Sequence, residues 1–526
     1  MILLPIPSRL DTIMADMRSG DMDILKEEAI DHQLELVSLG IDTQQEFIVF
    51  LRADSPIVIS EGFDALTRIL VIYNERSIIA TLNIIYSDLL KEGELGLSIS
   101  ALKKLGAKAG DRLRLSHVPP ITSLGQLRAK MYGNKLSEQA YQHIIKDLAQ
   151  GKYSNIHIAS FVTACVGDNL DIDEVTYLTK AMVKTGDQLK WSKDMVIDKH
   201  CIGGLPGNRT TPIAVPILAA AGLTIPKTSS KAITSPAGTA DTMGTMTPVD
   251  LSINMIKEVV ARENGCIAWG GAAHLSPADD LMIRVERALD IDSEGQMIAS
   301  VLSKKVAAGA THVVIDIPVG PTAKVRTEES ALKLKYKFTA IGKSVGLEVK
   351  VMITDGSQPV GRGIGPALEA KDVLAVLRNQ TGLPIDLRDR ALCLAGAMLE
   401  LAGSAKTGKG ERMAKEILFS GRALNKFYAI CQAQGGFKEP PTAPFQHNVL
   451  ASQSGIIQSI DNRKLAQVAK LAGAPHDPAA GLEVFASIGS SVATGQPLYC
   501  IHAESQGELK YALDFAVSGV DIFEIS

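Results

Sequence analysis

The chain has 526 residues, of which 46% are hydrophobic and 21% are charged, and its formal net charge is -4. These values are ordinary for a globular protein of two to four domains, and the slight acidic excess argues against a nucleic-acid partner. The six cysteines lie far apart and form no Cys-x-x-Cys pair, so the sequence indicates neither a disulfide framework nor a metal site. Pro5, Pro7, Arg9 and Asp11 interrupt the first apolar patch, and no signal-peptide core or membrane span follows. We therefore expect a reduced, cytoplasmic protein with no membrane partner.

Residues 1–118 predict a separate, mostly β module. Strand-like runs with a short helix among them occupy residues 47–51, 77–82, 98–105 (the helix) and 112–115. The module contains no group of polar residues that resembles a catalytic site. We therefore interpret it as an assembly or stabilising module, and Pro119-Pro120 marks its end.

Residues 119–190 predict a helical lobe. Ser137 is placed to cap its first long helix, and further helices are expected at 154–166 and 173–185. Two later helices, within about residues 276–308, are expected to join this lobe. Ser276, Pro277 and the two acidic residues that follow are typical of a helix start.

Residues 191–438 alternate between predicted strands and helices, which indicates a parallel sheet covered by helices. The strands are expected at 195–197, 223–225, 266–269, 312–317 and 347–353. Residues 439–526 read as a compact α+β domain. The predicted fold class is thus α/β, with a helical lobe and a parallel-sheet lobe separated by a cleft, an N-terminal mostly-β module and a C-terminal α+β domain.

Two glycine- and hydroxyl-rich loops follow the first two predicted strands of this sheet, at 198–211 and 227–241. Backbone N–H groups beside glycine at the start of a helix bind anions, and Lys199, Arg209 and Lys231 add positive charge. Because neighbouring parallel strands end at the same edge of a sheet, both loops are expected to face one pocket. The pair of loops therefore predicts a phosphate site.

Several other residues have both a functional and a purely structural interpretation. Ser300 and Lys304 lie one helical turn apart, so they either bind the carbonyl edge of a nucleobase or form a solvated helix face. Asp292 precedes their helix and is either a cap or a proton donor. His200 follows Lys199 in the first loop, and Lys324 follows a strand end, where open α/β sheets bind ligands.

These residues resemble the thymidine and pyrimidine-nucleoside phosphorylase family over roughly residues 120–515. The matching segments are Lys199 to Gly204, Ser229 to Asp241, Ala299 to Lys305, Gln358 to Arg362 and Gly495 to Leu498. The long N-terminal module and the segment Ser229 to Ser235 are similar to a subgroup that includes AMP phosphorylases.

The resemblance implies roles for individual residues. Inorganic phosphate would be held by Lys199, Cys201, Thr211, Ser229 and Thr239. A nucleotide would contact Gly204, Ser230, Lys231, Ala232, Ile233, Thr234, Ser235, Thr239, Ser300 and Lys324. Asp292 or His200 would act as the acid, with Ser300 and Lys304 as hydrogen-bond donors to the base.

The implied reaction is phosphorolysis of thymidine to thymine and 2-deoxyribose 1-phosphate, and the alternative is phosphorolysis of AMP to adenine and ribose 1,5-bisphosphate. Inorganic phosphate is then a co-substrate, no other cofactor and no metal is expected, and the partners are a nucleoside or nucleoside monophosphate. The family also implies hinge closure of the lobes and a homodimer or larger homo-oligomer.

Two departures from the family bear on the substrate. Cys201 stands where the nucleoside enzymes carry a phosphate-binding serine, and a thiol is a weaker donor. Neither Arg284 nor Arg287 aligns cleanly with the arginine that binds the pyrimidine. Two further readings stay open: a magnesium-dependent enzyme similar to anthranilate phosphoribosyltransferase, and a nucleotide-binding module without catalytic activity.

Overall fold

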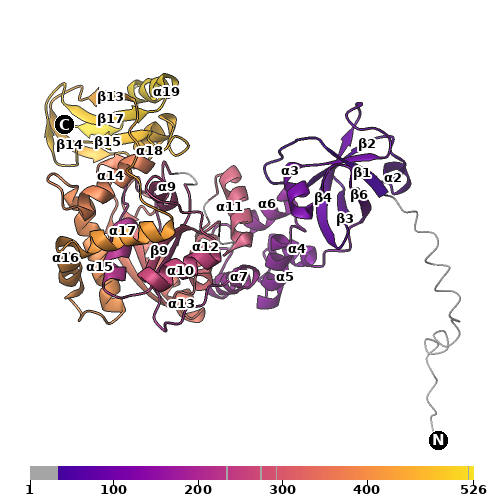
Figure 1. Ribbon diagram of the computed structural model, residues 1–526, viewed down its shortest axis with the longest axis horizontal. Helices are drawn as coiled ribbons and strands as arrows, with labels where there is room; N and C mark the ends of the chain where they lie inside the picture. Colours follow the sequence, from indigo (N-terminus) through magenta and orange to yellow (C-terminus); the bar gives the residue numbers. More distant parts are fainter. Residues whose placement is uncertain (1–32, 233–234, 273–274, 292, 519–520) are drawn as a thin grey trace, which may run out of the picture. The chain divides into compact units, whose positions relative to one another are not determined.

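The computed structural model describes residues 33–232, 235–272, 275–291, 293–518 and 521–526. Asp292, Ile233 and Thr234, which the sequence analysis names as site residues, lie outside these ranges. The chain divides into two compact units (Figure 1). One holds the described residues up to Thr122 together with Gly151–Asn155, and the other holds Ser123–Gln150 and the residues from Ile156 onward. Within the described part, every helix is too short or too polar to cross a bilayer.

The first unit is built on a closed barrel with the strand order β1-β5-β2-β4-β3-β6 (Figure 1). Its elements are β1 (Gln33–Ser38), β2 (Ile48–Arg52), α2 (Pro56–Ser60), β3 (Arg68–Tyr73), β4 (Arg76–Ile85), β5 (Glu94–Leu97), α3 (Ile99–Leu105) and β6 (Arg112–His117). The pairs β1–β5 and β2–β4 are parallel, and the other pairs are antiparallel. Alternate side chains such as Leu36, Val49 and Leu82 fill the interior, so the predicted β module is confirmed.

The second unit begins with four helices: α4 (Ser123–Met131), α5 (Glu138–Ala149), α6 (Asn155–Ala164) and α7 (Ile172–Thr185). Ser137 caps α5 as predicted, because its hydroxyl accepts a hydrogen bond from Ala140 N. The later helices α11 (Pro277–Leu289) and α12 (Glu294–Ala307) pack against α5 and α7. The predicted helix start at Ser276 and Pro277 is confirmed, although the buried Ser276 hydroxyl makes no capping hydrogen bond.

The α/β part contains two parallel sheets, β11-β10-β7 and β8-β9. A parallel bridge between Val196 and Thr224 links them. Its elements are β7 (Ile197–Cys201), α8 (Thr211–Ala220), β8 (Ile225–Ser229), α9 (Thr239–Gly244), α10 (Ile253–Glu263), β9 (Gly265–Trp269), β10 (His312–Val319), α13 (Glu328–Ser344), β11 (Glu348–Asp355), β12 (Gly363–Ile364), α14 (Pro366–Leu377), α15 (Ile385–Leu401), α16 (Gly410–Phe419) and α17 (Arg422–Gln434). Helix α8 lies at the centre of the core, against α15 and α17.

Two strands of this part continue farther than the sequence predicted. β7 includes Lys199, His200 and Cys201, and β8 includes Thr228 and Ser229, all of which were expected in loops. These strand ends carry polar side chains, which are typical of loops, so the sequence did not predict them as strand. In the structure the parallel pairing of β7 with β10 and of β8 with β9 outweighs the local preference.

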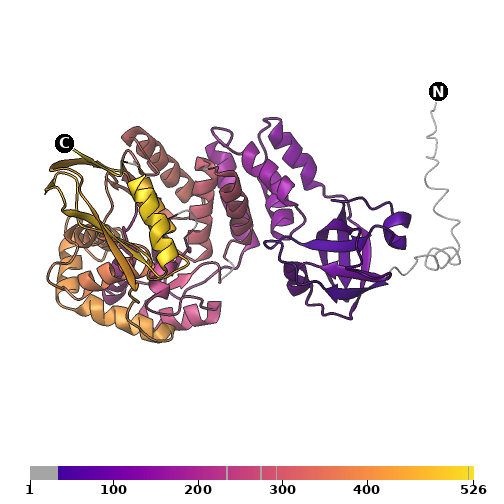
Figure 2. The same cartoon turned by 90° about the horizontal axis from the view of Figure 1, so that it is seen from above.

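The C-terminal part is a small α+β domain, as predicted. Its elements are β13 (Phe445–Leu450), β14 (Gly455–Ile460), α18 (Asn462–Leu471), β15 (Gly481–Val484), β16 (Ser491–Val492), β17 (Pro497–Ala503), α19 (Gln506–Val517) and β18 (Phe523–Ile525). Its larger sheet has the order β12-β15-β17-β13, so the short strand β12 of the α/β part is its edge. Helices α18 and α19 pack on this sheet and on each other (Figure 2).

Candidate active site

The first loop begins at a buried lysine. Lys199 Nζ donates a hydrogen bond to Thr210 Oγ1 at 2.5 Å, so the ammonium is tied to the residue that precedes α8. Burial lowers the pKa of Lys199, and the charge of Asp316 on the neighbouring strand opposes that shift. Burial raises the pKa of the Cys201 thiol to about 12, so the thiol stays protonated at neutral pH. The loop therefore offers a cation and a neutral, weak donor side by side.

Glycine is required where this loop turns. Gly203 and Gly204 have φ values of 87° and 77°, a region that other residues avoid. A Cβ on Gly204 would lie 2.4 Å from the backbone nitrogen of Lys324, so this loop and the loop after β10 pack closely. Lys324 is exposed at this point of contact. The structure thus brings together two segments that are 120 positions apart in the sequence.

The second loop is held by its own aspartate. Asp241 Oδ2 accepts hydrogen bonds from Ala232 N at 2.6 Å and from Gly238 N at 2.9 Å. A Cβ on Gly238 would lie 2.6 Å from Ser230 O, so the two arms of the loop are in contact. Thr239 follows as the first residue of α9 and is buried. These contacts hold the described residues Ala232 and Gly238 of the loop to Asp241.

Lys231 makes contacts outside the loop. Its ammonium lies 4.0 Å from the centre of the Trp269 ring and 3.5 Å from Asp250 Oδ1. A cation above an aromatic face is attracted by the ring, although an exposed pair of this kind contributes little. The hydroxyl of Ser235 donates to Ala237 O at 2.9 Å. Among the described hydroxyls of this loop, Ser229 is half-buried and Ser230 is exposed.

A partly buried arginine joins the two loops, and the sequence analysis did not identify its carboxylate partner. Arg209 Nη2 donates to Ala237 O at 2.7 Å and Nη1 donates to Thr239 Oγ1 at 3.2 Å. Its Nε pairs with Glu369 Oε2, which also accepts from Thr242 Oγ1 at 2.8 Å. Nothing in the sequence links Glu369 to a loop 160 positions earlier. The structure thus confirms that both loops lie together, as neighbouring parallel strands predicted.

Three charged side chains form a buried cluster on the other face of β7. Asp198 lies 2.7 Å from Lys305 Nζ and 3.5 Å from Lys227 Nζ. Burial lowers the pKa of Lys227 to about 7. Burial and the surrounding lysines, Lys305 first, hold the pKa of His200 well below its usual value. His200 is therefore a neutral imidazole at neutral pH. It can donate or accept a hydrogen bond, but it is not protonated before the reaction.

Ser300 and Lys304 share one side of α12, as their spacing predicts, and both meet a residue that the sequence analysis did not name as functional. Ser300 Oγ donates to Asp279 Oδ2 at 3.0 Å, and Lys304 Nζ pairs with the same oxygen. Burial opposes the charge on Lys304, but Asp279 raises its pKa above the usual value. Asp279 lies in the first turn of α11, where the sequence suggested only a favourable charge for the helix dipole.

Of the remaining predicted site residues, one is described by the structure and three are not. Thr211 opens α8 and is buried behind the first loop. Asp292, Ile233 and Thr234 are outside the described residues, so their roles stay predictions. No three His, Cys, Asp or Glu side chains of the described ranges are grouped to hold a metal ion.

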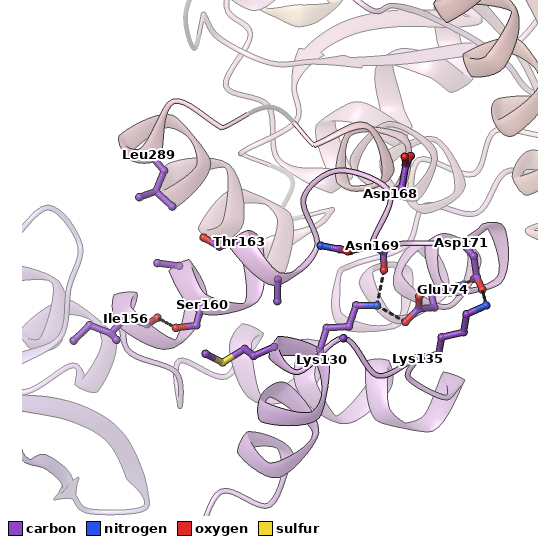
Figure 3. A pocket seen from close by; sticks show the side chains of 14 residues that line it. Lys130, Lys135, Ile156, Ser160, Thr163, Asp168, Asn169, Asp171, Glu174 and Leu289 are labelled. Carbon is purple, nitrogen blue, oxygen red and sulfur yellow. Dashed lines mark hydrogen bonds and ion pairs between the residues drawn. The ribbon is translucent and has the colours of Figure 1, made fainter.

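A cavity of about 890 Å³ lies in the helical lobe, apart from the two loops. Figure 3 shows Lys130 reaching toward Glu174, and Leu289 of α11 at the other side. Lys130 Nζ donates to Glu174 Oε1 at 2.7 Å and to Asn169 O at 2.6 Å, and Lys135 Nζ lies 2.7 Å from Asp171 Oδ2. Each lysine of the lining is thus paired with a carboxylate of the same lining. The predicted cleft between the lobes stays a prediction.

Comparisons with known proteins agree with this arrangement. The family model described as the glycosyl transferase family a/b domain matches residues 193–424, and the helical bundle domain of that family matches residues 126–186. The pyrimidine nucleoside phosphorylase C-terminal domain matches residues 456–522. These matches confirm the predicted combination of a helical lobe, an α/β lobe and a C-terminal domain.

Related proteins match nearly the whole chain. A protein of Acidovorax sp. (strain JS42), provisionally named thymidine phosphorylase 1, is 54% identical over 94% of this chain and 97% of its own length. One of Legionella pneumophila (strain Corby), provisionally named thymidine phosphorylase, is 55% identical over 93% of this chain and 95% of its own length. Anthranilate phosphoribosyltransferase of Thermus thermophilus, a solved structure, aligns over 59% of this chain and 98% of its own, with 18% identity and a TM-score of 0.49. On the strength of the family models and the full-length relatives, the chain belongs to the thymidine and pyrimidine-nucleoside phosphorylase family.

Proposed function

We propose that the chain cleaves the N-glycosidic bond of a pyrimidine nucleoside with inorganic phosphate, and that thymidine is its substrate. The observation that carries this proposal is that Arg209 joins the two glycine- and hydroxyl-rich loops next to Thr210, which accepts from the buried ammonium of Lys199. The names of the full-length relatives support the same substrate. The expected products are thymine and 2-deoxyribose 1-phosphate.

In the proposed reaction a phosphate oxygen attacks the anomeric carbon while the bond from that carbon to the base nitrogen breaks. The transition state of such glycosyl transfers resembles an oxocarbenium ion, and negative charge grows on the base. Lys199 and the loop amides hold the nucleophile, because charge-assisted hydrogen bonds are the strongest available. No redox cofactor and no metal takes part in this scheme.

The leaving base needs donors at its carbonyl edge. Lys304 supplies the N–H groups that Asp279 does not use, and the Ser300 hydroxyl, which donates to Asp279 in the absence of a ligand, turns its O–H to the base in this scheme. Asp279 keeps Lys304 protonated. His200 is neutral at neutral pH, so in this scheme it serves as a hydrogen-bond partner, and Asp292 is the candidate proton donor. The family's homodimer or larger homo-oligomer is part of the proposal.

AMP is the second candidate substrate. Lys324 borders Gly204 of the first loop, so a cation is placed beside the pocket where a 5′-phosphate would lie. A site built for a dianion loses charge-assisted contacts when a bare nucleoside binds, which penalises the nucleoside strongly. AMP phosphorolysis would give adenine and ribose 1,5-bisphosphate.

A substrate panel with thymidine, uridine and AMP, assayed for base release with and without phosphate in the presence of EDTA, tests both candidates. Phosphate-dependent release of thymine supports the first proposal. Release that requires magnesium, or no release from any substrate, would refute it.

Lys324→Ala sharpens the choice between thymidine and AMP. If AMP is the substrate, the substitution should lower catalytic efficiency by about 2 kcal/mol or more, since a charge-assisted contact is lost. With thymidine it should have little effect. A chain that releases adenine readily, ignores thymidine and fails after Lys324→Ala would establish the AMP reaction instead.

A further inference from the structure

We propose that Glu369 is a positioning residue for the phosphate site, acting through Arg209 to hold the two loops in register. The inference rests on the proposed function, because it assigns the role of the loops to phosphate binding. Glu369 lies on α14, outside both loops, and its side chain is 1% exposed.

Glu369 connects three separate segments. Its Oε2 accepts from Arg209 of the first loop and from Thr242 Oγ1 of α9, at 2.8 Å for the latter. Its Oε1 accepts from Gly365 N at 3.4 Å, at the start of its own helix. One carboxylate thereby fixes the first loop, the helix that follows the second loop, and the segment between β11 and α14.

Arg209 transmits this fixation to the groups that would meet phosphate. Its two terminal nitrogens bind Ala237 and Thr239 of the second loop. The next residue, Thr210, accepts the hydrogen bond from Lys199 Nζ. A shift of Arg209 would therefore move the second loop against the first and also disturb the partner of the buried ammonium.

The backbone supports the same geometry. Asn208 N donates to Val360 O at 2.8 Å, and a Cβ on Gly207 would lie 2.3 Å from that oxygen. The strand just before α14 belongs to the C-terminal sheet, because Ile364 on β12 pairs with Leu482 on β15. The Glu369–Arg209 pair thus ties a helix outside both loops to the arginine that joins them.

Glu174 in the helical lobe provides a matched control. Its carboxylate is similarly buried and also has three partners, since Oε1 accepts from Lys130 Nζ, Leu136 N and Tyr141 Oη. Breaking either buried pair destabilises the fold, because a charge is left without its partner. Only Glu369 is connected to the loops, so only its removal should act on phosphate.

The test measures binding of inorganic phosphate to the full chain by calorimetry, together with steady-state kinetics. Glu369→Gln should weaken phosphate binding, and raise the Michaelis constant for phosphate, by roughly ten- to a hundredfold. The Michaelis constant for the nucleoside should change little. Arg209→Lys, which keeps the charge but loses the planar fork, should cause a smaller loss of the same kind, and Glu369→Asp should recover part of it. Glu174→Gln should lower the melting temperature and leave phosphate affinity unchanged.

Unchanged phosphate affinity in a folded Glu369→Gln chain, or equal losses for phosphate and nucleoside, would overturn the inference. If Glu369→Gln does not fold, Thr242→Val decides, because it removes one hydrogen bond from an uncharged donor to the same carboxylate and should weaken phosphate binding roughly two- to tenfold. Full affinity in Thr242→Val would then overturn it. Calorimetry needs no turnover, so a wild-type chain that binds phosphate without releasing base refutes the proposed reaction alone.

Discussion

The barrel and the α/β part differ in where their charged side chains lie, at the surface or in the interior. In the described barrel the buried polar side chains are the uncharged Ser55, Thr81 and Ser98, and the ion pair of Arg52 with Asp54 is on the surface. In the α/β part Asp198, Lys199, Lys227, Asp316 and Glu369 are all buried, and so is Lys305 of α12, which pairs with Asp198. Buried charge is costly unless it is paired, so natural proteins retain it mainly where it serves a purpose.

This difference in buried charge indicates which part of the chain holds the candidate active site. The barrel interior is filled by apolar residues that alternate along its strands, which is sufficient for a stable module. The α/β part instead buries lysines together with carboxylates, as where Asp198 Oδ1 lies 3.5 Å from Lys227 Nζ. Charges that are held in place before a ligand binds are typical of sites for charged ligands.

The largest effect should follow from Asp198→Asn. This change leaves Lys305 and Lys227 without their shared partner, and removing one member of a buried pair typically costs about 3–5 kcal/mol. Lys227 can release its proton near neutral pH, which favours the lower end of that range. Denaturant unfolding of both chains at pH 7 measures the loss.

Asp54→Asn in the barrel is the control for this comparison, because Asp54 is solvent-exposed. It should leave the unfolding midpoint within error, as expected for a surface pair. Similar midpoints for Asp198→Asn and Asp54→Asn would show that burial of charge does not distinguish the two regions.

Lys199→Ala should have the next largest effect, on ligand binding rather than on folding. Losing a charge-assisted contact costs about 1.5–3 kcal/mol, which corresponds to a roughly ten- to a hundredfold higher Michaelis constant for phosphate. The constant for the nucleoside should rise much less. Initial-rate kinetics with each substrate varied in turn provide the measurement, and equal changes in both constants would contradict the assignment.

The helices and most strands could be predicted because their signals are local. The hydroxyl of Ser137, the glycines after α8 and α12, and apolar periodicity lie within a few residues of the elements they define. The ends of β7 and β8 could not, since Lys199 and Lys227 read as loop residues. Only pairing with a distant strand shows that these charged residues belong to a sheet.

The residues of the candidate site could also be predicted only where their signals are local. Glycine and hydroxyl residues mark each loop by themselves, so both loops were found. The carboxylates that hold them were not, because Glu369 acts on a residue 160 positions away and Asp279 has an ordinary place in a first helical turn. An acidic residue without a local signature becomes a site residue only when the fold supplies its partner.

The pH dependence of stability offers a finer test of the buried cluster. The pKa of Lys227 is about 7 in the folded chain, against a usual value of 10.5. Between these values the unfolded chain binds a proton that the folded chain lacks, so this residue makes stability rise with pH. Below about pH 7 both states are protonated, and the penalty for burying the charge is fully present.

Lys227→Met removes this titration. The difference in unfolding free energy between wild type and Lys227→Met should therefore shift in favour of wild type as the pH rises from about 7 toward 10. Denaturant unfolding at several pH values gives that difference. A constant difference across the range would mean that Lys227 keeps its usual pKa despite burial.

The smallest effect on turnover should come from removing the barrel. The described barrel buries no charged side chain, so a chain that begins near Ile121 keeps every buried charge named above. We therefore expect its turnover per folded molecule to persist and its oligomer size to change. Arg68 Nη2 donates to Gly151 O at 3.2 Å and to Lys152 O at 3.4 Å, and water can replace it at these carbonyls after truncation. Light scattering and base-release assays on the same sample measure both properties. A folded truncated chain without activity would show that the barrel contributes to catalysis. Burial of charge would then not distinguish the catalytic part of the chain from the part that serves assembly.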